Sequence, residues 1–315
     1  DIPESLGQLT QLTGLYLYEN QLSGGIPDSL GQLTQLTQLY LDQNQLSGGI
    51  PNSLGQLTQL TVLDLDRNQL SGNIPESLGQ LSQLIVLALD RNQLHGSIPD
   101  SLGQLTQLTV LGLDFNQLSG NIPESLGKLT SCVQMLLDNN QLNGVVPLDL
   151  LSLSNLRLLD VSHNQLSGSL ASVRNVTSLV YLNFSNNTGL QVSGGWSAAS
   201  WLGHDLKQLA DLNLQGVRLP PGFLSSLPSL PRLATLNVND TRVSGTLDAN
   251  ISRRFPSLAA LLLQSNELTG PIPPLPTGLR ALIAFDNDFT QLPPLQPLRN
   301  LTYLVLDGNR RMAGQ

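Results

Sequence analysis

Aspartate recurs along the first half of the chain at a fixed step of 24 residues, with one extra carboxylate beside the row. The members are Asp42, Asp66, Asp90, Asp114 and Asp138, and the extra residue is Asp64. Such a row could attract a cationic partner or metal ions, although a calcium site needs several oxygens that converge on one point. It could equally be a solvated polar edge that duplication has copied. The sequence leaves both interpretations open, with Arg67 and Arg91 placed to neutralise part of the row.

Aromatic and apolar side chains gather at two other places that a partner could recognise. Near the N-terminus the chain carries Tyr16, Tyr18 and Tyr40, and exposed aromatic clusters favour contacts with proteins or sugars. These tyrosines could also shield an exposed end of the fold. An apolar set near the C-terminus comprises Leu262, Ile283, Phe285 and Tyr303. It indicates either a partner surface or a surface covered by a further C-terminal segment.

Catalytic chemistry finds little support in the residue pattern. The histidines are His95, His163 and His204, and Cys132 is the single cysteine. No Cys/His metal spacing, nucleophile elbow or phosphate-binding loop is present. Cys132 occupies a position at which a repeated sequence pattern elsewhere in the chain has leucine, which indicates a buried apolar role. We therefore predict a protein that is not an enzyme, with no cofactor and no dedicated metal site.

The elements that position these side chains follow from a repeat. The pattern Leu-x-x-Leu-x-Leu-x-x-Asn spans residues 12–20, returns every 24 residues, and continues with more variation to residues 301–309, giving thirteen segments. A period of this length predicts a solenoid, in which each repeat buries its apolar face against its neighbours. Within a segment Leu63 and Leu65 alternate with polar residues, and this period of two predicts a strand with one buried face. The aspartate row and the tyrosines then point out of the same strand surface.

Each strand segment is followed by an asparagine such as Asn68. A side-chain amide can donate and accept, so we expect a ladder of asparagines that satisfies backbone groups left unpaired by the turn. Val217 and Thr241 replace this asparagine and indicate local irregularity. Trp196 and Trp201 lie just before these repeats, where they either anchor a recognition loop or fill a gap in the core.

Between the strand segments the chain repeats two further motifs. One copy reads Leu70-Ser71-Gly72-Asn73-Ile74-Pro75, followed by Leu78-Gly79-Gln80-Leu81. With these motifs the chain resembles, over nearly its whole length, the plant-type subclass of the leucine-rich-repeat family. The resemblance implies an α/β solenoid in the form of a horseshoe, with a parallel β-sheet on the concave side and short helical turns on the convex side. It also implies a second, minor strand near Leu-Ser-Gly and an extracellular setting.

We expect one elongated domain of about thirteen repeats over residues 1–315. Within it, residues 1–127 hold near-identical 24-residue repeats, residues 188–208 an irregular insertion and residues 209–315 divergent repeats. Plant-type ectodomains usually carry cysteine-paired caps. Neither end of this chain shows one, which leaves self-association through uncapped ends open.

Charge and composition limit the partners. Charged residues make up 12% of the chain and the net charge is -8, so nucleic acid and anionic membranes are poor partners. No apolar run approaches the roughly 18 residues of a membrane span. Sequons predict N-glycosylation at Asn175, Asn183, Asn186, Asn239, Asn250 and Asn300. Asn183 is expected on the outward strand surface, where a glycan would obstruct binding.

The leading hypothesis is a non-enzymatic recognition module, secreted or at the cell surface, that binds a protein, peptide or glycan on its concave strand surface. The aspartate row with Tyr16 and Tyr40 is the first candidate surface, and the C-terminal apolar set is the second. One alternative is a structural subunit that stacks end to end into a filament or extracellular matrix. Another is an ice- or mineral-binding surface, which regular polar ladders favour.

Overall fold

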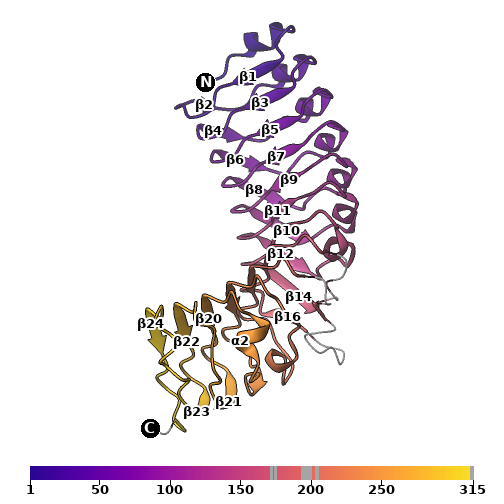
Figure 1. Ribbon diagram of the computed structural model, residues 1–315. Helices are drawn as coiled ribbons and strands as arrows, with labels where there is room; N and C mark the ends of the chain where they lie inside the picture. The colour runs from indigo at the N-terminus through magenta and orange to yellow at the C-terminus, as the bar shows by residue number, and fades with distance from the viewer. Residues whose placement is uncertain (171–172, 174–175, 193–200, 203–205, 313–315) are drawn as a thin grey trace. The chain divides into compact units, whose positions relative to one another are not determined.

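The computed structural model describes residues 1–170, 173, 176–192, 201–202 and 206–312. The chain divides into two compact units, Asp1–Leu156 and Arg157–Gln315, each of which is a stack of coils (Figure 1). Each coil gives one main strand to a parallel ladder, and the described residues hold six such strands in the first unit and seven in the second. The predicted solenoid of parallel strands and short helical turns is thereby confirmed. That all coils act as one domain stays a prediction.

Alternating leucines form the main strands of the first unit. Consecutive strands pair in parallel and in register, so that Leu39 lies beside Leu63 and Leu63 beside Leu87, all with no exposed surface. The strands are β1 (Gly14–Tyr16), β3 (Gln38–Tyr40), β5 (Val62–Asp64), β7 (Val86–Ala88), β9 (Val110–Gly112) and β11 (Gln134–Leu136). We call their outward surface, opposite the buried leucines, the strand face of the first unit.

The return path of each coil in the first unit adds a minor strand and a 3-10 turn. The minor strands are β2 (Ser23–Gly24), β4 (Gln45–Gly48), β6 (Gln69–Gly72), β8 (Gln93–Gly96), β10 (Gln117–Asn121) and β12 (Gln141–Gly144), and they form the predicted second ladder. The helical turns are η1 (Glu4–Gln8), η2 (Asp28–Gln32), η3 (Asn52–Gln56), η4 (Glu76–Gln80), η5 (Asp100–Gln104), η6 (Glu124–Lys128) and η7 (Asp149–Ser152).

Proline and glycine explain why these turns are short and closely stacked. Pro51 precedes η3 in an extended conformation, and the turn is closed by i→i+3 bonds such as Leu57 N–H to the Leu54 carbonyl at 3.1 Å. A Cβ added to Gly55 would lie 2.5 Å from the backbone carbonyl oxygen of Ser77 in the next coil. The glycine of each Leu-Gly-x-Leu motif therefore lets neighbouring turns approach.

The asparagine ladder forms as predicted. The Asn68 amide donates to the carbonyl oxygens of Leu41 at 3.0 Å and Leu65 at 3.2 Å. Its Oδ1 accepts the Leu46 backbone N–H at 2.9 Å. Asn92 repeats this set of contacts one coil later. Each side chain thus joins its own coil to the preceding coil, using backbone groups that no strand pairing satisfies.

The residue before each ladder asparagine has a left-handed backbone. Arg67 has a φ of 47° and Arg91 a φ of 51°, values that residues other than glycine seldom adopt. Each such residue costs about 1 kcal/mol, which the neighbouring asparagine contacts offset. We call this set the left-handed row, and in the first seven repeats it contains Glu19, Gln43, Arg67, Arg91, Phe115, Asn139 and His163.

The second unit continues the same design with coils of less regular length. Its main strands are β13 (Leu158–Asp160), β15 (Tyr181–Asn183), β17 (Asp211–Asn213), β18 (Thr235–Asn237), β20 (Ala260–Leu262), β22 (Ala281–Ile283) and β24 (Tyr303–Val305). Its other elements are β14 (Gln165–Ser169), β16 (Gly189–Gln191), β19 (Ser244–Gly245), β21 (Glu267–Pro271), β23 (Asp288–Gln291), η8 (Leu224–Ser226) and α2 (Ile251–Arg254). Thr241 stands in for a ladder asparagine, and its hydroxyl donates to the Val238 carbonyl at 3.0 Å.

Two buried residues, Trp201 and Cys132, test the core predictions. Trp201 is fully buried with its ring centroid 6.3 Å from Phe184 and 6.0 Å from Phe223, which supports the gap-filling interpretation. Trp196 and much of the insertion lie outside the described residues. Cys132 is fully buried, and this burial raises the pKa of its thiol to about 12, as expected of an apolar core residue.

No helix in the described ranges is long and apolar enough to cross a membrane.

Candidate functional site

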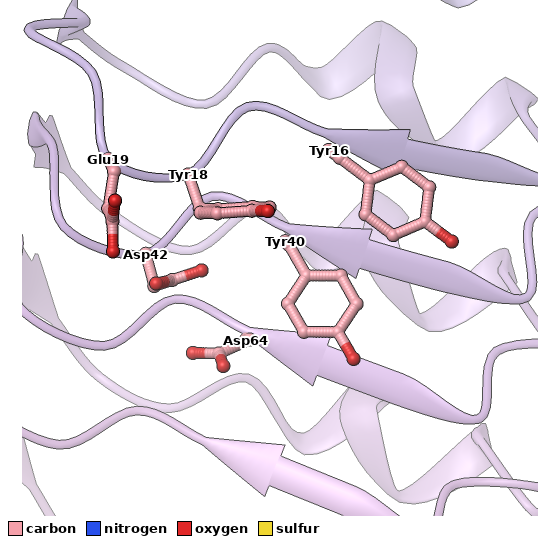
Figure 2. A pocket seen from close by; sticks show the side chains of 6 residues that line it. All are labelled: Tyr16, Tyr18, Glu19, Tyr40, Asp42 and Asp64. Atoms are coloured by element: carbon pink, nitrogen blue, oxygen red, sulfur yellow. The ribbon is translucent and has the colours of Figure 1, made fainter.

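A cavity of about 350 Å³ opens on the strand face over the first three coils. Strand register brings its central side chains together, because Tyr16 of β1 pairs with Tyr40 of β3 and Tyr40 pairs with Asp64 of β5. We call this cavity the tyrosine–aspartate pocket. It is lined by Tyr16, Tyr18, Glu19, Tyr40, Asp42 and Asp64 (Figure 2). The structure thus unites two sets of residues that the sequence offered as separate candidates.

The tyrosines form the aromatic part of the pocket. Tyr16 and Tyr40 stack with ring centroids 5.4 Å apart and an interplanar angle of 17°, and Tyr18 meets Tyr40 edge-on at 6.2 Å. The Tyr16 hydroxyl donates to Oε1 of Gln38. Tyr16 is 54% exposed and Tyr18 48% exposed, so their rings offer apolar and π surface to a ligand. They do not fill the core.

Two aspartates that line the pocket, Asp42 and Asp64, converge with a third, Asp66, that lies beside it. One oxygen each from Asp42, Asp64 and Asp66 lies within 4.8 Å of the others, whereas the sequence predicted only a linear row. Asp42 is 8% exposed, and its Oδ1 is buried without a hydrogen-bond partner. Its Oδ2 accepts from Gln43 Nε2 at 3.4 Å. Within the described residues, this is the one group of carboxylates, histidines or cysteines close enough to share a metal ion.

Burial shifts the ionisation of this cluster. Burial, with like charge from neighbouring carboxylates, raises the pKa of Asp64 to about 7. Burial and the charge of Asp90 raise the pKa of Asp66 to about 6, although Arg67 and Arg91 act in the opposite direction. Part of the cluster therefore holds protons near neutral pH, and a bound cation would expel them.

Arginines compensate the aspartate row from the third coil onward. Arg67 Nε lies 3.7 Å from Asp66 Oδ2. The Arg91 guanidinium lies 4.4 Å from the centre of the Phe115 ring, and its charge opposes the burial that raises the pKa of Asp114 to about 7. At the far end of the row, Asp138 accepts from Asn139 Nδ2 at 2.7 Å. In the pocket itself, which lies inside the fully described segment 1–170, no lysine, arginine or histidine is among the lining residues.

Duplication alone does not account for the pocket. The first five repeats are nearly identical in their core and turn positions, and from the second repeat onward they share the aspartate row, but they differ at the middle outward strand position. At the middle outward position they read, in order, Tyr16, Tyr40, Asp64, Ala88 and Gly112. The middle of the strand face thus varies while its scaffold stays constant, which is the pattern of a recognition surface on a rigid support.

Comparison with known proteins places these repeats in a family. A family model described as a leucine-rich repeat region matches residues 52–274, and a leucine-rich-repeat model matches residues 11–33 and 35–57. The chain belongs to the leucine-rich-repeat family. A comparison with curated protein sequences gives no significant match.

Solved plant proteins share these leucine-rich-repeat coils. The ectodomain of the Arabidopsis thaliana receptor kinase GASSHO1/SCHENGEN3, in complex with CASPARIAN STRIP INTEGRITY FACTOR 2, is 33% identical with a TM-score of 0.85, and the match covers 98% of this chain and 37% of that chain. The plant peptide hormone receptor RGFR1, in complex with RGF2, is 27% identical with a TM-score of 0.73, over 96% and 60%. A plant ice-binding protein is 26% identical with a TM-score of 0.53, over 93% and 80%. The repeats are thus of the plant type, and this chain spans less than two thirds of either receptor chain.

The C-terminal apolar set of this leucine-rich-repeat chain lies on main strands of the second unit. Leu262 of β20 pairs with Ile283 of β22, and both are half-buried, as is Phe285 two residues later. Tyr303 of β24 pairs with Ala281 and is 65% exposed. The set lies on or next to the neighbouring main strands β20, β22 and β24, and its role as a partner site stays a prediction.

The sequons differ widely in accessibility. Asn250 and Asn300 are exposed, whereas Asn186 and Asn239 are half-buried. Asn183 lies on the main strand β15 as expected, but it is only 6% exposed, and its amide donates to Asp160 Oδ2 at 3.0 Å. The sixth sequon, at Asn175, lies outside the described residues.

Sequence reasoning missed two residues at the rim of the pocket. Glu19 lines the cavity, and Gln43 Nε2 lies 3.4 Å from both Glu19 Oε1 and Asp42 Oδ2. Both belong to the left-handed row. Their position immediately before a ladder asparagine is the sequence signal that would have found them.

Proposed function

We propose that this protein is a non-enzymatic extracellular recognition module whose strand face in the first unit binds a peptide. The observation that carries the proposal is the tyrosine–aspartate pocket, an open cavity with aromatic and acidic walls on a regular strand ladder. Two of the similar plant structures support it, because one is an ectodomain in complex with CASPARIAN STRIP INTEGRITY FACTOR 2 and the other is described as a peptide hormone receptor.

The physical basis of binding is a surface that is already ordered. Parallel strands in register hold Tyr16, Tyr40 and Asp64 in place before a ligand arrives, so binding orders few groups of the protein itself. Exposed tyrosines provide large contact area at low conformational cost. Carboxylates at their side select ligands by charge.

The proposal is tested by selecting binders from a displayed library of random peptides against the purified protein. We expect enriched peptides whose affinity falls about tenfold in Tyr18→Ala or Asp66→Asn, which alter the strand face. Glu76→Gln and Asp100→Asn change exposed carboxylates on η4 and η5 and serve as matched controls. Peptides that bind all four variants equally, or a selection that yields no binder, would overturn the proposal.

An extracellular setting makes a separate prediction about glycans. On expression in a eukaryotic secretory host, Asn250→Gln and Asn300→Gln should each remove one glycan, because both acceptors are exposed. Asn183→Gln should remove none, because its amide is buried against Asp160. Gel mobility with and without a glycosidase measures this. A secreted wild-type chain whose mobility the glycosidase leaves unchanged would contradict the prediction.

A second candidate function is an ice-binding surface. The likeness to a plant ice-binding protein favours it, together with the regular polar ladders of the first unit. It predicts thermal hysteresis or shaped ice growth from the purified chain, and ice that grows as in buffer alone would exclude it. Glycan binding and end-to-end stacking into a filament stay predictions, and size-exclusion chromatography that shows discrete monomers would eliminate the filament.

A further inference from the structure

The left-handed row contains an arginine in some repeats and an acidic or neutral residue in others. In the third and fourth repeats the row carries Arg67 and Arg91, and Arg91 reaches across to the aromatic ring of Phe115 in the fifth. In the first two repeats the corresponding positions are Glu19 and Gln43. The pocket therefore has aromatic rings and aspartates, but the arginine that accompanies them in later coils is absent from its lining.

The carboxylates of the pocket are correspondingly uncompensated. Asp42 Oδ1 is buried without a partner, and the side chain that carries it is more than nine-tenths buried. The Gln43 amide, 3.4 Å from Asp42 Oδ2, is a neutral donor at long range. Asp64 lies beside Asp42 and Asp66 within 4.8 Å, and of these three carboxylates only Asp66 has an arginine, Arg67, within 4 Å among the described residues. A positive group placed beside Asp42 and Asp64 would therefore relieve repulsion that the protein itself leaves in place.

The shape of the pocket discriminates among cations. The stacked Tyr16 and Tyr40 rings and the edge-on Tyr18 present flat π surface next to the carboxylates, with Asp42 and Asp64 below Tyr18 in Figure 2. A guanidinium is planar, stacks on aromatic rings and donates to a carboxylate in a fork. A calcium ion instead needs six or more oxygen ligands and gains little from aromatic walls.

We propose that the tyrosine–aspartate pocket takes the guanidinium of an arginine side chain in the peptide ligand, with its tyrosine rings receiving the guanidinium as the Phe115 ring of the same chain receives that of Arg91. This inference rests on the proposed function and deepens it. It names the charge and shape of one ligand residue and the side chains that receive it.

The experiment compares three blocked peptides that place arginine, lysine or citrulline between glycines, with titration calorimetry on the full chain. Citrulline keeps the shape of arginine and removes its charge. We expect the arginine peptide to bind about tenfold more tightly than the citrulline peptide, with lysine between them. Asp64→Asn and Tyr16→Ala should each weaken the arginine peptide about fivefold. Asp100→Asn, which changes an exposed carboxylate on η5 outside the strand face, should leave its affinity unchanged.

Gln43→Arg provides a sharper variant, because it gives the second coil the arginine that the next two coils possess. We expect the new side chain to occupy the pocket from within, raise the thermal midpoint and abolish binding of the arginine peptide. Circular dichroism establishes that each variant is folded.

Equal binding of arginine and citrulline peptides would overturn the inference, while library peptides that still require the strand face would leave the proposed function intact. Calcium chloride that binds with dependence on Asp42, Asp64 and Asp66, when the arginine peptide does not bind, would show a metal site instead. If the library also yields no binder, both proposals fail.

Discussion

Asn68→Ala is expected to lower the free energy of unfolding by about 3–4 kcal/mol, because it leaves several buried backbone groups without partners. The Asn68 side chain satisfies the carbonyl oxygens of Leu41 and Leu65 and the N–H of Leu46, all of them buried. These groups belong to two neighbouring coils, so the loss weakens the interface between coils as well as the turn. Urea denaturation followed by circular dichroism measures the change.

Asn20→Ala is the matched control at the first position of the ladder. The Asn20 amide is exposed, and its bonds go to the Leu17 and Tyr18 carbonyls of its own coil, at 3.2 and 3.0 Å. We expect a loss of about 1 kcal/mol or less there, since water can replace it. Asn68→Thr should fall between the two, because threonine already serves at Thr241. Equal losses in Asn20→Ala and Asn68→Ala would show that the ladder does not stabilise the stack.

The protein should become less stable as the pH rises from about 5 to about 8, by about 2 kcal/mol after each shift is discounted for solvent exposure. Burial raises the pKa of Asp64 and Asp114 from 3.8 to about 7 and that of Asp66 to about 6. Between the ordinary and the raised values the folded state holds more protons than the unfolded state. The stability contributed by these protons is therefore present at low pH and lost as the pH passes through 6 to 7.

Thermal midpoints measured at fixed ionic strength across this range check the prediction. Asp64→Asn and Asp114→Asn should flatten the dependence, because they remove groups with raised pKa. Asp100→Asn, on an exposed 3-10 turn, should leave it unchanged. Asp248 does not affect this window, since the backbone N–H of Asn250 and then Arg254 hold the pKa of its carboxyl below the usual value. A midpoint that is constant or rises with pH would contradict the assignment.

Most of the fold could be predicted from the sequence because the same pattern of leucines and asparagine recurs in each repeat. The alternation of Leu63 and Leu65 with aspartates defines a strand, and Asn68 defines its exit, in copy after copy. Cys132 and the break at Thr241 follow from the same frame. The type of helical turn did not follow, because Pro51 and the close approach at Gly55 select a 3-10 turn only when neighbouring coils are stacked.

The candidate site was predicted less completely. Periodicity places Tyr16, Tyr40 and Asp64 on one surface. It does not give the side-chain rotamers, so it could not predict that the carboxylates of Asp42, Asp64 and Asp66 converge. Asn183 shows the same limit. Its outward position follows from alternation, whereas its burial depends on Tyr181 and Asp160, which reach over from the same and the neighbouring strand.

In the left-handed row, backbone shape and side-chain identity are decoupled. Glu, Gln, Arg, Phe, Asn and His all occupy one conformation there, so the neighbouring amides dictate the bend and leave the functional group unspecified. Mutation can therefore exchange an acidic for a basic side chain, or an aromatic one for an amide, along the left-handed row while the leucine core and the asparagine ladder stay intact. A lineage with this architecture can retarget its molecules by point changes at a handful of sites, without first having to regain the ability to fold.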